Sequence, residues 1–162
     1  LSSSSAASDV YKRQGKQGLE NLHGLNPGGG VQLPFGRVEL TIAHHSSSLP
    51  DGSYGGQPNG ILMFLDEGPT LYYAGDTTVF FEMQLIGEHG IDLAFLPIGD
   101  YFTMGPEGSL KAIEFLKPSV VIPMHYNTFE PIKQDAAAWA QRVRNETAAR
   151  PVVLDPGGSY EL

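Results

Sequence analysis

In the first half of the chain, apolar and polar residues alternate with a period of two, between clusters of Gly, Pro and Asn. Residues 38–43 follow this alternation and predict a strand with one face on a core. Residues 61–65 and 70–73 flank an Asp-Glu-Gly-Pro run, which is typical of a hairpin. Residues 46–60 are polar and rich in glycine, so they predict a long loop of the kind that often carries function.

In the second half, strand-like runs alternate with apolar residues at helical spacing. Pro106 and Glu107 suit the first turn of a helix, and Lys117-Pro118 ends it. Helices are predicted over residues 79–86, 106–116 and 135–148, and strands over residues 91–98, 120–123, 152–154 and 159–162. This order indicates an α/β layered fold rather than a helical bundle or a pure β-sandwich.

Composition narrows the function classes. The chain has 18 acidic and 10 basic residues, for a net charge of -8, so we expect no nucleic-acid partner. Its longest apolar runs have only the length of a strand, so we expect no membrane partner. Cysteine is absent, which excludes thiolate chemistry, is compatible with a cytoplasmic protein, and leaves His, Asp and Glu as the ligands for any metal.

The first 14 residues differ from the rest of the chain, because a Ser/Ala tract and a basic pair occur there without periodicity. We interpret residues 1–14 as a non-native or disordered lead. Residues 15–162 are expected to form one domain or part of one.

Three candidate metal ligands, His45, Asp76 and His125, each follow the end of a predicted strand. In layered α/β proteins such strand ends gather at one edge and form the site. Imidazole and carboxylate groups suit a hard or borderline divalent cation. Because neighbouring strand residues face opposite sides, only one of His44 and His45 can point into a site.

Each candidate also has an ordinary structural interpretation. His44 and His45 could form a polar strand end. Asp76 could cap a helix that begins near Thr78, and His125 could be a core histidine whose ring bonds a backbone carbonyl.

Several uncommon runs occur together in an order that resembles the later motifs of a metal-dependent hydrolase family in the metallo-β-lactamase superfamily, related to ascorbate-6-phosphate lactonase. The runs are His45-Ser46-Ser47-Ser48, Tyr73-Ala74-Gly75-Asp76-Thr77, Leu96-Pro97-Ile98-Gly99-Asp100, Phe102-Thr103-Met104-Gly105-Pro106-Glu107 and Ile122-Pro123-Met124-His125-Tyr126-Asn127-Thr128-Phe129. The resemblance covers about residues 15–162.

The resemblance implies a site with two divalent ions, Zn or Mn. In it, His45 would bind the first metal, Asp76 would be the catalytic carboxylate that bridges both metals, and His125 would bind the second. Asp100, Thr103 and His44 would line the pocket.

One part of the family pattern is missing: the superfamily's His-x-His-x-Asp-His run does not occur in this sequence. The resemblance then implies a partial four-layer αββα metallo-β-lactamase sandwich that lacks its N-terminal strands and first helix. We expect this fragment to be inactive alone, because catalytic zinc normally has at least three protein ligands.

The expected function of the parent protein is metal-dependent hydrolysis, in which metal-activated water attacks a lactone, ester or amide-like bond of a small-molecule substrate. A phosphodiesterase of the same superfamily is the first alternative, and a non-catalytic structural or interaction module is the second. A serine hydrolase is disfavoured, because no Gly-x-Ser-x-Gly elbow is present. The sequence also allows a homo-oligomer.

Overall fold

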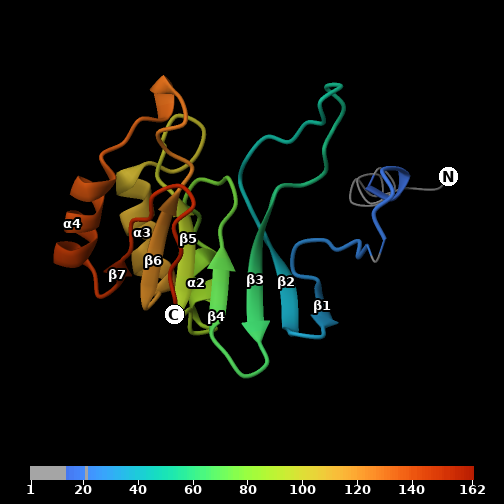
Figure 1. The fold of residues 1–162 in the computed structure, drawn as a ribbon, viewed down its shortest axis with the longest axis horizontal. Coiled ribbons are helices and arrows are strands. Elements are labelled where there is room, and N and C mark those ends of the chain that lie inside the picture. The colour runs from blue at the N-terminus through green and yellow to red at the C-terminus, as the bar shows by residue number, and fades with distance from the viewer. Residues whose placement is uncertain (1–13, 21) are drawn as a thin grey trace.

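The computed structural model describes residues 14–20 and 22–162 (Figure 1). The predicted lead lies outside the described residues, except for Gln14. Within the described part, the strands form one seven-stranded sheet in which spatial order follows sequence order. The strands are β1 (Gly30–Leu33), β2 (Gly36–Ile42), β3 (Asn59–Leu65), β4 (Thr70–Tyr73), β5 (Leu93–Pro97), β6 (Val120–Met124) and β7 (Arg150–Pro151).

The sheet has an antiparallel half and a parallel half. Strands β1 to β4 pair antiparallel. Short turns join β1 to β2 and β3 to β4, whereas the long loop of residues 43–58 joins β2 to β3. The predicted hairpin is the β3–β4 pair, with Met63 opposite Leu71. Strands β4 to β7 pair parallel. Parallel neighbours need a crossover connection, and a helix supplies each one here.

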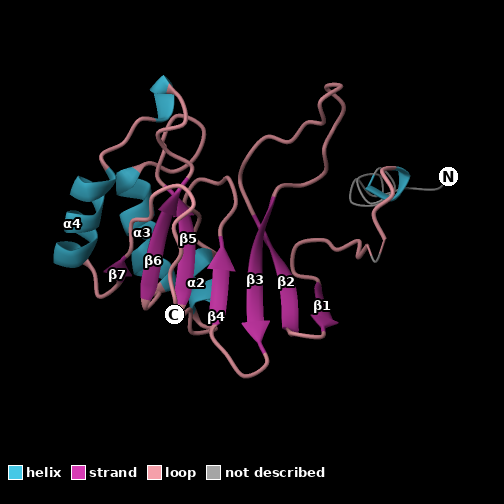
Figure 2. Ribbon diagram, in the orientation of Figure 1, coloured by secondary structure: helices cyan, strands magenta, loops and turns pink. Residues whose placement is uncertain are grey.

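The crossover helices cover one face of the sheet (Figure 2). They are α2 (Met83–Gly87), α3 (Pro106–Leu116) and α4 (Ala136–Glu146), and the short 3-10 turn η1 (Glu130–Ile132) precedes α4. Helix α3 has the predicted bounds, with Pro106 in its first turn. Asp135 caps α4 by accepting a hydrogen bond from the Ala138 backbone N–H.

The main core lies between this face of the sheet and the helices. Leu62, Tyr72 and Val121 point into it from the sheet, and Trp139 enters it from α4. The Trp139 indole N–H donates to the Ser109 hydroxyl on α3 over 2.8 Å, which joins two helices through a buried polar contact.

The second face of the sheet is less completely covered. The C-terminal segment packs on Leu93, Val120 and Ile122. Towards β3 and β4 the cover is thinner, and Tyr73 is 40% exposed. The structure thus confirms the α/β class with a sheet and a helical layer, and it leaves part of the second sheet face open to solvent.

Several elements differ from the sequence expectation. Helix α2 begins at Met83 rather than at residue 79, and the ring of Phe80, which precedes the helix, packs on His44. Strand β1 was not predicted, because its glycine-rich start gives no alternation. Residues 152–154 and 159–162 form no strand; a single ladder-like bond from the Val152 N–H to the Val121 carbonyl follows β7.

Of the helices in the described part of the chain, none combines the length and apolar character that crossing a bilayer requires.

Candidate metal centre at the upper edge of the sheet

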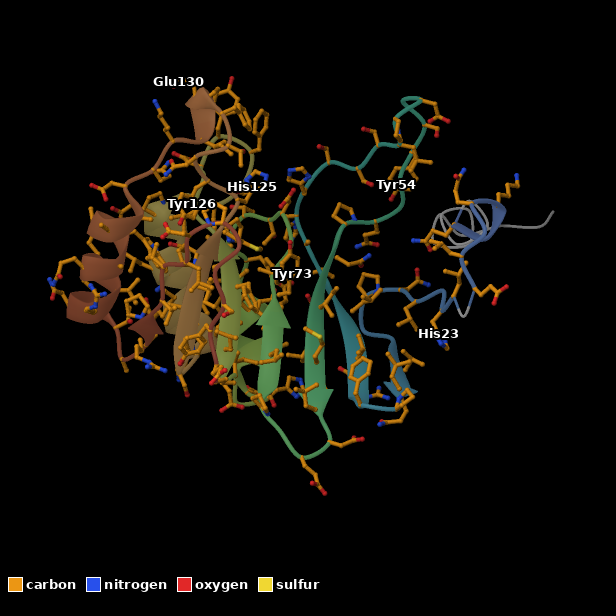
Figure 3. The ribbon with its side chains drawn as sticks, viewed as in Figure 1. His23, Tyr54, Tyr73, His125, Tyr126 and Glu130 are labelled. Atoms are coloured by element: carbon orange, nitrogen blue, oxygen red, sulfur yellow. The ribbon has the colours of Figure 1, made fainter. Side chains whose placement is uncertain are left out.

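The three predicted ligands all follow strands that end at the same edge of the sheet. Strands β2, β4 and β6 run in the same direction, since β2 and β4 each pair antiparallel with β3 and β4 to β6 are parallel. His45, Asp76 and His125 come shortly after the ends of these strands. In Figure 3 the His125 side chain lies above the upper end of the sheet.

Asp76 is placed by a tight turn after β4. Gly75 has a φ of +67° there, and a Cβ at this position would lie 2.6 Å from the Asn59 carbonyl oxygen. Glycine is therefore required at this point, both for its backbone conformation and for the close approach of β3. The N-cap of α2 is Glu82, so Asp76 does not cap that helix and the capping interpretation is wrong.

Asp76 and His125 are neighbours in space. The distance between Asp76 Oδ2 and His125 Nε2 is 3.6 Å, which is longer than a hydrogen bond. Two ligand atoms of one tetrahedral cation, each about 2.0–2.2 Å from it, would be separated by roughly 3.3–3.6 Å. The observed spacing therefore fits two groups that share a cation better than two groups that bond each other.

The backbone of His125 adopts an uncommon conformation. Its φ is +54°, in the left-handed region that non-glycine residues seldom occupy. Gly99 lies against it, and any Cβ at Gly99 would overlap the His125 carbonyl oxygen. The Ile98 N–H also donates to the Met124 carbonyl over 3.1 Å, so the end of β5 holds the end of β6 in place.

The two nitrogen atoms of the His125 ring differ in their surroundings. Nε2 faces Asp76, whereas Nδ1 is buried and has no hydrogen-bond partner within the described part of the chain. The core-histidine interpretation required a bond from the ring to a backbone carbonyl, and the structure does not show one. Nε2 is thus the nitrogen available to a metal.

Thr77 links the end of β2 to the Asp76 turn. Its buried hydroxyl accepts from the His44 backbone N–H over 2.9 Å and donates to the Thr78 carbonyl over 2.8 Å. The His44 ring packs against Phe80, with ring centroids 5.2 Å apart. His44 is therefore engaged in packing beside the turn.

His45 has a defined tautomer. Its Nδ1 lies 2.7 Å from the Ser46 carbonyl oxygen, and because a carbonyl only accepts, Nδ1 must carry the proton. Nε2 is then the nitrogen with a lone pair, as in histidines that ligate metals.

The structure joins the three predicted ligands only in part. Asp76 and His125 form a pair, but among the described residues no group of three or more His, Asp or Glu side chains is arranged to hold a metal ion. His45 lies at the same edge without completing such a group. The donor set of the pair, one imidazole and one carboxylate, fits a borderline divalent cation.

The two predicted pocket residues on the loop after β5 differ in exposure, because Asp100 is exposed and Thr103 is buried. The Asp100 side chain lies against Gly105, where a Cβ would be 3.0 Å from Asp100 Cγ. The Thr103 side chain is buried, and its hydroxyl donates to the Met104 carbonyl over 3.2 Å.

Sequence reasoning missed several residues that shape this edge. Thr77 and Gly99 are ordinary residue types whose roles depend on contacts with distant segments. Tyr101, Phe102 and Phe129 form a cluster of exposed rings on the loops that follow β5 and β6. The sequence signal available for Thr77, Gly99, Phe102 and Phe129 was their position in the family-like runs, whereas Tyr101 lies outside them.

Residues 3–126 match the family described as the Beta-lactamase superfamily domain. The chain belongs to the metallo-β-lactamase superfamily. It is 53% identical over 138 residues to a metal-dependent hydrolase of Thermus thermophilus, covering 85% of this chain and 61% of that protein. It is 46% identical over 160 residues to a metal-dependent hydrolase of Deinococcus radiodurans, covering 97% of this chain and 68% of the relative.

Solved structures of the superfamily show the same fold. A metallo hydrolase from the archaeon Ignicoccus hospitalis matches with a TM-score of 0.80 and 39% identity, over 91% of this chain and 63% of that one. A Zn-dependent hydrolase of the superfamily from Thermotoga maritima matches with a TM-score of 0.58 at 20% identity, over 80% of this chain and 69% of that one, and shows the fold alone. The chain thus spans about three fifths of the Thermus relative.

Proposed function

We propose that Asp76 and His125 are ligands in the two-metal site of a metal-dependent hydrolase, with His45 as a further ligand. The observation that carries this proposal is the 3.6 Å separation between Asp76 Oδ2 and His125 Nε2. The names of the relatives, which are metal-dependent hydrolases, support the same class.

A divalent cation at this site would lower the pKa of water and polarise the bond to be cleaved. The side chain of Asp76 is 43% exposed and that of His125 is 28% exposed, so both can be reached from solvent. Asp76 would act as a ligand through its carboxylate oxygens. The Gly75 turn and the Gly99 contact keep the two side chains at the same edge.

The substrate that we propose is a small molecule with a lactone, ester or amide-like bond, and the metals are Zn or Mn. The resemblance to a lactonase family makes a lactone the first choice. The net charge of -8 disfavours a phosphodiester polymer. A cytoplasmic location agrees with the absence of cysteine.

The described residues alone are expected to hold metal weakly. Asp76 and His125 would provide two protein ligands to a cation, and the described residues contain no group of three. Catalytic zinc normally has at least three protein ligands. We therefore expect this chain by itself to bind zinc reversibly and to turn over little substrate.

Zinc titration by calorimetry tests the pair directly. His125→Asn should weaken zinc binding at least about tenfold while keeping the fold, because asparagine tolerates the left-handed backbone at this position. His89→Asn is the matched control, since His89 is exposed and packs on Phe64 away from this edge. Equal zinc affinity of both variants would show that His125 is not a ligand. If one equivalent of zinc stays bound after dialysis, the chain supplies more ligands than the two proposed here.

A non-catalytic interaction module is the second candidate, and the half-exposed second face of the sheet favours it. Tyr73 and Phe95 lie on this face with ring centroids 6.1 Å apart, and Tyr73 is 40% exposed. Asp76→Asn separates the two candidates in a longer protein that contains the full site. Lost activity with an unchanged melting temperature supports the hydrolase, whereas lost stability or no effect supports the module.

A further inference from the structure

The upper edge of the sheet carries three exposed aromatic rings, which we call the aromatic ledge: Tyr101, Phe102 and Phe129. They are 71%, 51% and 47% exposed, respectively. The Tyr101 and Phe102 rings meet edge to face with centroids 4.6 Å apart, and the Phe102 and Phe129 centroids are 6.1 Å apart. Two separate loops, after β5 and after β6, thus contribute to one apolar surface.

The loop after β5 is tied to the residues of the metal centre. The Met104 N–H donates to the Thr77 carbonyl over 2.8 Å, next to Asp76. The Asp100 N–H donates to the Met104 carbonyl over 3.2 Å, which closes the loop that carries Tyr101 and Phe102.

The loop after β6 is connected to the metal centre and to the loop after β5. It begins at His125, and its Asn127 N–H donates to the Ile132 carbonyl over 3.0 Å. Gln134 connects it to the other loop, since the Gln134 side-chain amide donates to the Gly99 carbonyl over 3.2 Å. These contacts place Phe129 beside the β5 loop, on the loop that begins at His125.

Both loops are held in uncommon backbone conformations. Asp100, Tyr101, His125 and Asn127 have φ values between +54° and +61°. Such conformations cost free energy and persist where the surroundings impose them, often at functional sites. The aromatic ledge thus lies on two loops that are hydrogen-bonded to each other. Binding a ligand there would cost little conformational entropy, because the loops are already ordered.

The charges around the ledge are acidic or paired. Glu130 forms an ion pair with Lys133 over 2.9 Å. Asp100 precedes Tyr101 in the same loop, and the chain has a net charge of -8. Without bound metal, an anionic group would be repelled here, whereas a neutral ring would gain contacts with three aromatic side chains.

We propose that Tyr101, Phe102 and Phe129 form a specificity surface that binds a neutral aromatic group of the substrate, beside the bond that is cleaved. This deepens the proposed function and rests on it for the position of that bond. The aromatic contact itself requires no metal.

Saturation-transfer NMR and calorimetry with 1-naphthaleneacetamide, on the 162-residue chain in EDTA, test the ledge. We expect saturable binding that weakens roughly two- to tenfold in Phe102→Ala and in Phe129→Ala. Phe35→Ala is the matched control, because Phe35 is 53% exposed and lies in the β1–β2 turn at the opposite end of the sheet. Acetamide should not bind detectably, and 1-naphthaleneacetate should bind more weakly than the amide.

The proposal is wrong if the amide does not bind, if Phe35→Ala weakens it as much as Phe102→Ala, or if the anion binds more tightly. Should Phe102→Ala lose its fold, Phe102→Leu tests the same point, since it keeps apolar area and removes the ring. Zinc titration of the same samples separates the two proposals. Zinc binding without amide binding overturns the ledge alone, whereas amide binding through the ledge without zinc binding supports the ledge and overturns the metal site.

Discussion

Gly99 lies directly against His125, so that the end of β5 and the end of β6 touch through their backbones. A side chain at Gly99 would overlap the His125 carbonyl oxygen and would lie 3.1 Å from Ile132 Cβ. The position of the His125 ring relative to Asp76 therefore depends on the absence of a side chain on the neighbouring strand end.

Gly99→Ala should push the His125 backbone away from β5. We expect it to lower the free energy of unfolding by about 1–3 kcal/mol, in the range of overpacked buried sites, and to weaken zinc binding. Urea unfolding and zinc calorimetry measure the two effects. Gly15→Ala is the control, because its Cβ would meet Leu22 at an ordinary 3.8 Å; identical behaviour of the two variants would contradict the positioning role.

Thr77→Val should detach the end of β2 from the Asp76 turn. The change removes the acceptor of the His44 N–H and leaves the size of the side chain unchanged. We expect a loss of about 1–2 kcal/mol, typical of a buried hydrogen bond whose partner is left unsatisfied. Thr77→Ser keeps the hydroxyl and should recover most of that loss in thermal unfolding; a serine variant as unstable as the valine variant would show that the hydroxyl is not responsible.

Ser109→Ala should destabilise the contact between α3 and α4. The buried Trp139 indole N–H would lose its acceptor, at a cost of about 1–3 kcal/mol. Trp139 is the single tryptophan of the chain, so its fluorescence follows urea unfolding directly. An unchanged midpoint would indicate that another group replaces the serine oxygen.

Tyr72 should make the fold sensitive to alkaline pH. Burial raises the pKa of Tyr72 to about 12 from its ordinary value of 10.0. Because the folded value lies above the unfolded one, the stabilising contribution is complete below pH 10 and is lost as the pH rises towards 12. The loss should reach about 1.4 kcal/mol per pH unit in that window.

Tyr72→Phe should remove this part of the pH dependence, as measured by urea unfolding at pH 8 to 11.5. Tyr54→Phe is the control, since Tyr54 is 61% exposed and should leave the wild-type slope intact. A Tyr72→Phe protein with the same alkaline slope as wild type would argue against this account.

The local pattern of the sequence determined much of the secondary structure. The alternation of apolar residues predicted β2 and the β3–β4 hairpin, and the Pro106 start with the Lys117-Pro118 stop predicted α3. These signals are local, because the side-chain periods of strands and helices relate residues that are only two to four positions apart in the sequence. The same patterns placed Asp76 and His125 after strands, as candidate ligands.

Only the tertiary structure decided how these residues meet. The pairing order of the sheet brings Asp76 and His125 to 3.6 Å, and it leaves His45 outside any group of three ligands in the described residues. The role of Gly99 and the joining of Phe102 with Phe129 depend on contacts between neighbouring strand ends. Local periodicity determines which face a residue occupies, whereas the distance between residues far apart in the chain depends on strand order and packing.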